Sequence, residues 1–177
     1  MKRVLSLLTL AASLIFFSGC TSVYMAPASE SAAAKEFRQT DPSKAQLYVY
    51  RPNHIVGVSV KKAIWIDGTY VGQLKRRTFL LEEIEPGDHV ITTESEFGNK
   101  HILLQAEPGK QYFVRQNIKF GVFTAGASIR FVDEARGKSD IVRECELIEA
   151  LRKASVDIPA NEIEREYRKL KKRAGIQ

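Results

Sequence analysis

Two short runs of β-branched and aromatic residues meet at the dipeptide Asp67-Gly68, and this pair constrains the fold more than any other stretch. The runs are Val60 to Ile66 and Thr69 to Leu74. Asp-Gly is favoured in a two-residue type I′ turn, because both central residues of that turn need positive φ. The pattern therefore predicts a tight antiparallel hairpin.

Similar turn signals separate further runs that have the composition of strands. Pro86-Gly87 precedes one alternating run, and Pro108-Gly109 precedes another. Pro and Gly at these positions are typical of turns. Short strands at this spacing predict a mainly β domain, either an antiparallel β-sandwich or a partly open barrel. Besides the hairpin, the expected strands are Gln46 to Tyr50, Thr78 to Ile84, His89 to Thr93, His101 to Ala106, Gln111 to Lys119 and Ser128 to Val132.

The composition is that of an ordinary globular chain. It has 177 residues, of which 44% are hydrophobic and 27% charged, and a single domain of this size needs no disulfide to hold a core. The net charge of +6 lies mainly at the two ends: Lys2 and Arg3 carry +2, and residues 161–177 carry +3 from six basic and three acidic side chains. The middle is close to neutral, so the charge does not indicate nucleic-acid binding.

The first twenty residues are typical of an export signal. Lys2 and Arg3 precede an apolar segment, Val4 to Phe17, whose fourteen residues are too few to span a bilayer comfortably. The next residues, Ser18-Gly19-Cys20, resemble the lipobox of bacterial lipoprotein signal peptides, although that family usually has leucine where Phe17 stands. The resemblance implies a signal peptide over 1–19, cleavage before Cys20, and acylation of its thiol and new amine. The alternatives are an ordinary signal peptide or a buried apolar helix.

Acyl chains on Cys20 would anchor the protein in a membrane, since each buried methylene contributes about 0.8 kcal/mol and two chains suffice for stable binding. Residues 20–44 are rich in Ala and Ser and predict a flexible tether with a fully extended reach of roughly 80 Å. Thr21, rather than Asp, follows Cys20. In a bacterium with two membranes, the lipoprotein resemblance then implies the outer membrane, with the domain facing the periplasm.

The expected β domain, residues 45–150, carries four motifs, which are Leu47 to Pro52, Ile66-Asp67-Gly68 with Val71-Gly72, Pro86 to His89, and Pro108 to Val114. Together they resemble the pattern of one bacterial family. The family is DUF2846, a domain of unknown function that is similar to the PEGA-type β modules of envelope proteins. Turn glycines and core aromatics make up the motifs, so the resemblance implies an envelope lipoprotein with a β-rich domain and brings no catalytic residues.

After the expected strands, the apolar spacing becomes helical. Ile141, Cys145, Ile148 and Leu151 have this spacing, although Cys145 to Ile148 could instead form a final strand. Cys145 is the one cysteine besides Cys20. Its apolar neighbours predict a buried, unreactive thiol, with an intermolecular disulfide as the alternative.

Residues 151–177 predict a basic helical extension. Asn161 to Glu164 has the form of a capping box, in which Asn161 would cap the helix. Ile163, Tyr167 and Leu170 form a narrow apolar stripe. Such a helix either docks on its own domain or meets an envelope protein partner through this stripe.

The sequence contains no recognised catalytic motif, neither a nucleophile elbow nor a nucleotide-binding loop. His54, His89 and His101 lack metal-ligand spacing, so no metal or cofactor is expected. The basic run Lys75-Arg76-Arg77 and the one from Arg168 to Arg173 are better explained by solvated surface than by lipid phosphates or acidic wall polymer. Solvated strand ends explain the carboxylates Glu82, Glu83, Glu85, Glu94 and Glu96.

These observations favour a non-catalytic structural or protein-interaction module of the envelope. The alternative is an accessory enzyme or a ligand-binding lipoprotein that acts on envelope glycans. A cleft lined by converging titratable side chains would favour the alternative, and an exposed apolar face would favour the interaction module.

Overall fold

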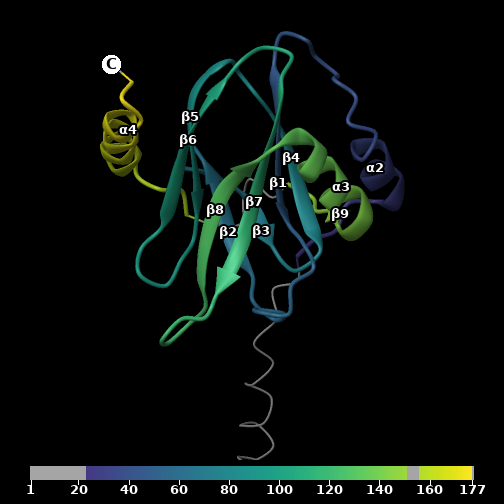
Figure 1. Cartoon of the computed structure of the whole chain (residues 1–177), viewed down its shortest axis with the longest axis horizontal. Helices are drawn as coiled ribbons and strands as arrows, with labels where there is room; N and C mark the ends of the chain where they lie inside the picture. Colours follow the sequence, from purple (N-terminus) through teal and green to yellow (C-terminus); the bar gives the residue numbers. More distant parts are fainter. Residues whose placement is uncertain (1–22, 151–155, 177) are drawn as a thin grey trace, which may run out of the picture.

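A computed structural model of the protein describes residues 23–150 and 156–176. Two β-sheets pack face to face and helices cover their outer faces (Figure 1), which confirms the expected mainly β sandwich with a C-terminal helix. The elements are α2 (Ala28–Ala34), β1 (Ala45–Arg51), β2 (Lys62–Ile66), β3 (Thr69–Leu74), β4 (Thr78–Ile84), β5 (Gly87–Thr93), β6 (Lys100–Ala106), β7 (Gln111–Lys119), β8 (Gly126–Val132), α3 (Glu134–Glu144), β9 (Glu146–Leu147) and α4 (Ala160–Ala174).

The two sheets have the strand orders β8-β7-β1-β4-β9 and β3-β2-β5-β6. Most neighbouring strands are antiparallel, but β1 pairs with β7 and β4 pairs with β9 in parallel. The inner faces of both sheets form one apolar core. Its members include Leu47, Val49, Ile64, Leu74, Leu80, Ile91, Leu104, Val114 and Ile148.

The β2–β3 hairpin turns at Asp67 and Gly68, whose φ angles of 50° and 83° are both positive, as a type I′ turn requires. A second constraint acts on Gly68. A Cβ atom there would lie 2.8 Å from the carbonyl oxygen of Ile158 and 3.0 Å from Cγ1 of Ile163. The absence of a side chain at this position therefore lets the C-terminal segment approach the turn.

Helices α2 and α3 cover the outer face of the five-stranded sheet. Four buried aromatic or apolar side chains lie beneath them, Tyr48, Tyr50, Phe79 and Phe113. Helix α3 approaches closely at Gly137, where a Cβ atom would lie 2.4 Å from Cγ of Phe113. The sheet is consequently buried on both faces at its centre.

Asp140 fixes α3 to this sheet. Its side chain is only 2% exposed, and its Oδ2 accepts a hydrogen bond of 2.9 Å from the Tyr50 hydroxyl. The same oxygen lies 3.0 Å from Nε of Arg136 and 3.4 Å from Nη1 of Arg115. A buried carboxylate is costly unless it is paired and hydrogen-bonded, and here both conditions are met.

Of the two alternatives for residues 141–151, the strand is correct for Cys145 to Ile148. Helix α3 ends at Glu144 and β9 follows, while Leu151 lies outside the described residues. The Cys145 thiol is buried, with Sγ 3.6 Å from the Arg51 carbonyl oxygen. Burial raises the pKa of this thiol to about 12, so at neutral pH it stays protonated and unreactive.

The described part of the expected tether differs from a flexible chain. Residues 28–34 form α2, and Phe37 packs edge-on against Phe113 at a centroid distance of 6.0 Å. Ser31 donates a 2.7 Å hydrogen bond to the Glu146 carboxylate. Met25 forms a β-bridge with Ile148. The packed structure therefore includes residues before Ala45, because Met25, Ser31 and Phe37 contact residues that lie far along the sequence, at positions 148, 146 and 113.

Two effects oppose a side chain at Gly68, the positive φ and the close contact with Ile158, and their costs in unfolding free energy can be measured separately. We expect Gly68→Ala to lower the free energy of unfolding by more than the roughly 1–2 kcal/mol that left-handed backbone costs a non-glycine residue. Gly98 is the matched control, since its φ is +82° and nothing lies within 4 Å of its Cβ position. Gly98→Ala should show the backbone cost alone in urea denaturation. Equal losses in the two variants would contradict the close contact at Gly68.

Candidate binding groove

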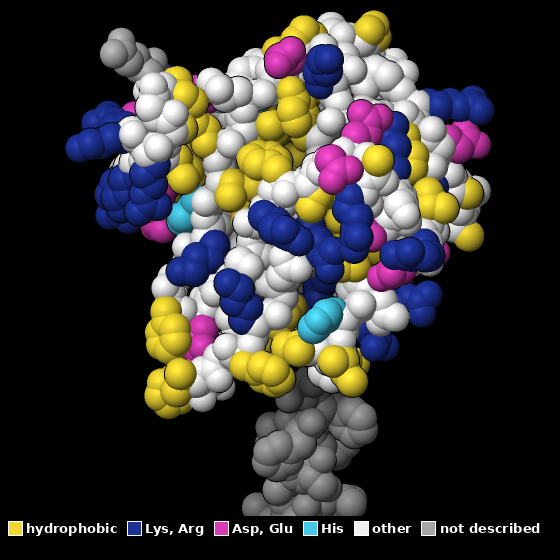
Figure 2. Space-filling view, in the orientation of Figure 1, with side chains coloured by type: hydrophobic (Ala, Val, Ile, Leu, Met, Phe, Trp, Pro, Cys, Tyr) yellow, Lys and Arg dark blue, Asp and Glu magenta, His cyan; other side chains and the backbone are white. Residues whose placement is uncertain are grey.

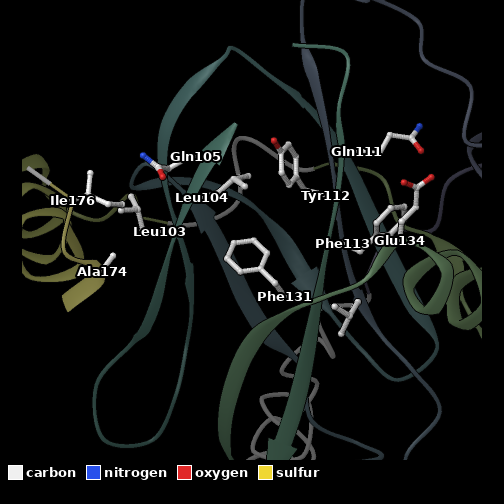
Figure 3. Close-up of a pocket in the computed structure, with 11 residues that line it drawn as sticks. Leu103, Leu104, Gln105, Gln111, Tyr112, Phe113, Phe131, Glu134, Ala174 and Ile176 are labelled. Atoms are coloured by element: carbon white, nitrogen blue, oxygen red, sulfur yellow. The ribbon is translucent and has the colours of Figure 1, made fainter. Parts of the chain in front are cut away.

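An apolar groove of about 440 Å³ opens between the two sheets along one side of the sandwich (Figure 3). Strand β6 ends one sheet on this side and β8 ends the other, and the two strands are not hydrogen-bonded to each other. The sandwich is therefore open here. The groove is lined by Leu103, Leu104, Gln105, Gln111, Tyr112, Phe113, Phe131, Val132, Glu134, Ala174 and Ile176.

The groove is an uncovered continuation of the core. Residues 127, 129 and 131 alternate along β8 and point to the same face of the sheet. Ala127 and Ile129 are 3% and 8% exposed, but Phe131 is 42% exposed. In Figure 3 the Phe131 ring lies near the centre of the groove, with Leu104 and Tyr112 above it. A core-type aromatic ring is thus left accessible.

Polar side chains in the groove already have partners. The Gln111 amide donates to the Phe37 carbonyl oxygen and to Oε1 of Gln46, each at 2.7 Å. The Gln105 amide donates to Asp88 at 3.1 Å. Among the described residues that line the groove, Glu134 is the one carboxylate. Acid–base chemistry needs positioned titratable groups, so this arrangement suits binding of an apolar group.

Ala174, at the end of helix α4, and Ile176, just after its C-cap, form the far wall of the groove. The helix begins at Ala160, with Pro159 as the N-cap residue and no side-chain cap. The expected capping box at Asn161 is therefore wrong. The fixed φ of Pro159 sets the start of the helix instead, at −56°. At the other end, Gly175 closes the helix with a φ of 69°.

Helix α4 docks on its own domain. Its stripe residues Ile163, Tyr167 and Leu170 are half-buried, and the Tyr167 hydroxyl donates a 2.8 Å hydrogen bond to Asp88 in β5. This hydrogen bond holds the pKa of the Asp88 carboxyl below its usual range. The stripe that could meet a partner therefore faces the four-stranded sheet in this structure.

The segment before α4 is fixed as well. The Trp65 indole donates to the Val156 carbonyl oxygen at 3.2 Å, and the Ile158 amide donates to the Gly68 carbonyl oxygen at 2.8 Å. Ile158 also packs on the cluster of Ala63, Trp65 and Tyr70. The outer face of the four-stranded sheet is thus covered by the chain's own C-terminal residues.

The remaining candidate residues are distributed as follows. Cys20, the expected lipidation site, lies outside the described residues. Gly87 and Gly109 have φ angles of 136° and 72°, and both follow exposed prolines, Pro86 and Pro108, in turns at one end of the sandwich. These turns connect strands and do not line the groove.

The three histidines do not gather into one site. Nδ1 of His89 lies 2.6 Å from Asp67, and this hydrogen bond raises the pKa of His89. His101 is paired with Thr92 at 2.9 Å, and Nδ1 of His54 accepts from the Val56 amide at 3.2 Å. Within the described ranges, no three His, Cys, Asp or Glu side chains are grouped as metal ligands.

Phe131 is the most central of the groove residues that sequence reasoning missed. The strand Ser128 to Val132 was expected, and alternation correctly places residue 131 on the same face as Ile129. The alternating pattern gives the face on which a residue lies, but not whether the opposite sheet covers that face. The one sequence feature that could indicate exposure is the position of Phe131 near the end of its strand.

Together, fold and groove define a helix-covered β-sandwich domain with an apolar groove along the side where β6 and β8 end the sheets. Comparison with known proteins gives its family. The family described as "Protein of unknown function (DUF2846)" matches residues 41–127. An uncharacterized protein of Haemophilus influenzae is 41% identical over 127 residues, which cover 72% of this chain and 75% of the relative. The chain belongs to the DUF2846 family. None of its helices over residues 23–150 and 156–176 is long and apolar enough to cross a membrane.

The docked position of α4 predicts the effect of its removal. A chain that ends at Pro159 keeps Val156 and Ile158 but loses the three stripe side chains and exposes the surface beneath them. Because full burial of such a side chain contributes about 1.5–3 kcal/mol and these are half-buried, we expect a loss of roughly 3 kcal/mol in unfolding free energy. A chain that ends at Gly175 keeps the stripe and is the control. Unchanged stability after the longer truncation would contradict the docking of α4.

Proposed function

We propose that this protein is a lipid-anchored envelope protein whose β-sandwich is a non-catalytic protein-interaction module. The observation that carries the proposal is the open apolar groove with Phe131 at its centre. An extended apolar segment of another envelope protein fits this site. Its side chains would occupy the groove, and its backbone would pair with one of the free strand edges.

The free edges support this mode of binding. Among the strands of the described residues, β6 pairs with β5 alone, and β8 pairs with β7 alone. An edge strand presents unpaired N–H and C=O groups, which another strand can join. Pairing would supply affinity, and the fit of alternate side chains into the groove would supply specificity.

The alternative, a site for envelope glycans, has less support here. Sugar hydroxyls require several hydrogen-bonding groups, and the amide nitrogens of Gln105 and Gln111 already donate to protein atoms. Glu134 lies 2.6 Å from Lys138, its ion-pair partner on the next turn of α3. An apolar protein segment needs fewer hydrogen-bonding side chains in the groove, so it fits the groove better than a glycan does.

The anchor is the second part of the proposal. We infer from the lipobox-like Ser18-Gly19-Cys20 that Cys20 carries the acyl chains and that the domain faces the periplasm at the outer membrane. A PEGA-like role as a small envelope module agrees with this placement. The acyl chains, rather than a membrane-spanning helix, would hold the protein at the bilayer.

Cys20→Ser tests the anchor, with Cys145→Ser as a matched control. Cells fed an alkyne-tagged fatty acid should label the wild-type protein and Cys145→Ser, because the Cys145 thiol is buried and unreactive. Cys20→Ser should carry no label and should leave the membrane fraction. Labelling that persists in Cys20→Ser would contradict acylation at this residue.

Site-specific photocrosslinking tests the groove. Benzoylphenylalanine replaces Phe131 in one variant and Val142 in the other; Val142 lies on α3 and is 55% exposed. We expect crosslinks to a defined envelope protein from position 131 and none from position 142. Equal crosslinking at both positions, or crosslinks from position 131 to glycan alone, would contradict a protein-binding groove.

A further inference from the structure

Four connections lie together at one end of the sandwich. They are residues 52–61, 75–77, 94–99 and 120–125, which follow β1, β3, β5 and β7. The antiparallel pairing of β2 with β5, and the parallel pairing of β1 with β7, bring these strand ends to the same side. We call this surface the loop end. The turns at Asp67-Gly68, Pro86-Gly87 and Pro108-Gly109 lie at the opposite end.

The loop end carries most of the strongly exposed apolar side chains of the described structure. Phe120 is 88% exposed and Phe123 is 86% exposed. In Figure 2, hydrophobic side chains gather along the lower margin of the molecule, where these loops project. The set is Ile55, Val58, Phe97, Phe120, Val122 and Phe123. Scattered single apolar residues are normal on a surface, but a group on adjacent loops marks an interaction site.

The loops are held in defined positions. The Glu96 carboxylate accepts hydrogen bonds from the backbone amides of Val122, Phe123 and Thr124, at 2.9 Å for Val122 and 3.0 Å for Thr124. On the other side, the buried Arg51 donates to the carbonyl oxygens of Gly57 and Val60, at 2.7 Å for Val60. The apolar tips are therefore fixed outward by polar contacts beneath them.

The charges of the two ends differ in sign. The loop end carries Lys61, Lys75, Arg76, Arg77, Lys100 and Lys119. Its acidic side chains include Glu94, which lies 3.4 Å from Lys62, and Glu96, which is engaged by the loop amides. The Glu144 carboxylate also lies here, where it accepts a 2.8 Å hydrogen bond from the Asn53 amide and pairs with Arg143 at 3.0 Å. The opposite end carries Asp67, Glu85, Asp88, Glu107, Asp133 and Glu134, with Lys44 and Lys110 among them. Dark blue side chains above the apolar margin in Figure 2 agree with a basic loop end.

The distance between the proposed anchor and the packed domain is short. Val23 packs against the core, and Cys20 precedes it by three residues. At most about 11 Å can separate the two Cα atoms, since an extended chain spans roughly 3.6 Å per residue. A protein acylated at Cys20 must therefore rest on the bilayer surface with one of its faces.

We propose that the loop end is a bilayer-docking surface, in which the aromatic tips enter the boundary between headgroups and acyl chains and the basic side chains bind lipid phosphates. The inference rests on the proposed acylation of Cys20. Aromatic and basic residues in this arrangement are what interfacial membrane binding uses. The acidic opposite end would be repelled by an anionic lipid surface, which leaves the groove open to the periplasm.

Depth-dependent quenching tests this orientation. The full-length mature protein, purified from membranes with its acyl mass verified on Cys20, is reconstituted into vesicles of phosphatidylethanolamine and phosphatidylglycerol. A polarity-sensitive fluorophore is attached at Phe123→Cys or, as the control at the opposite end, at Lys110→Cys. Cys145 is buried and does not compete for the label. Lipids brominated high in the acyl chain should quench the probe at position 123 several-fold more than the probe at position 110.

Charge variants supply the second readout. Lys100→Glu with Lys119→Glu should reduce quenching at position 123, whereas Lys110→Glu should not change it. Acylated protein without preferential quenching at position 123 would overturn the docking surface and leave the anchor in place. A purified protein without acyl mass on Cys20 would overturn the anchor and the docking inference together. In cells, benzoylphenylalanine in place of Phe120 should crosslink to no protein. A crosslink from this position to one defined envelope protein would assign the loops to that protein and would also overturn the proposal.

Discussion

Strand β1 is buried on both faces, and each layer of the protein is built against it. Leu47 and Val49 enter the core between the sheets, while Tyr48 and Tyr50 enter the layer beneath α2 and α3. The Tyr48 ring stacks on Phe113 at a centroid distance of 5.0 Å, and such pairs contribute about 0.5–1.5 kcal/mol beyond their burial. Burial raises the pKa of Tyr48 to about 12. Because β1 has no solvent-facing side, helices α2 and α3 are structural requirements of the sheet.

Local signals in the sequence predicted the strands and the Asp67-Gly68 turn, because turn chemistry depends on adjacent residues. They did not predict the parallel pairing of β1 with β7, whose partners, such as Tyr48 and Phe113, are far apart in the sequence. The same limit applies to α2. An Ala-rich segment has the composition of a linker, and its packing against Glu146 depends on a strand that forms at the other end of the chain. The groove and the exposed loop end are also products of tertiary structure.

Two surfaces then follow from one topology. The open edge between β6 and β8 leaves Phe131 accessible along one side, and the loops after β5 and β7 hold Phe97, Phe120 and Phe123 at one end. If the loop end faces the bilayer, the groove lies on a flank that periplasmic proteins can reach. The short chain between Cys20 and Val23 connects the two proposals, since it sets how far the groove stands from the membrane.

The central claim is that the folded domain stands directly on the membrane and is not suspended from it. Neutron reflectometry of the acylated full-length protein on a supported bilayer measures this directly. The account predicts a protein layer that begins at the lipid headgroups, without an intervening layer of water. A hydrated gap that approaches the roughly 80 Å reach of an extended chain over residues 20–44 would show that these residues are a free tether, and would contradict the account.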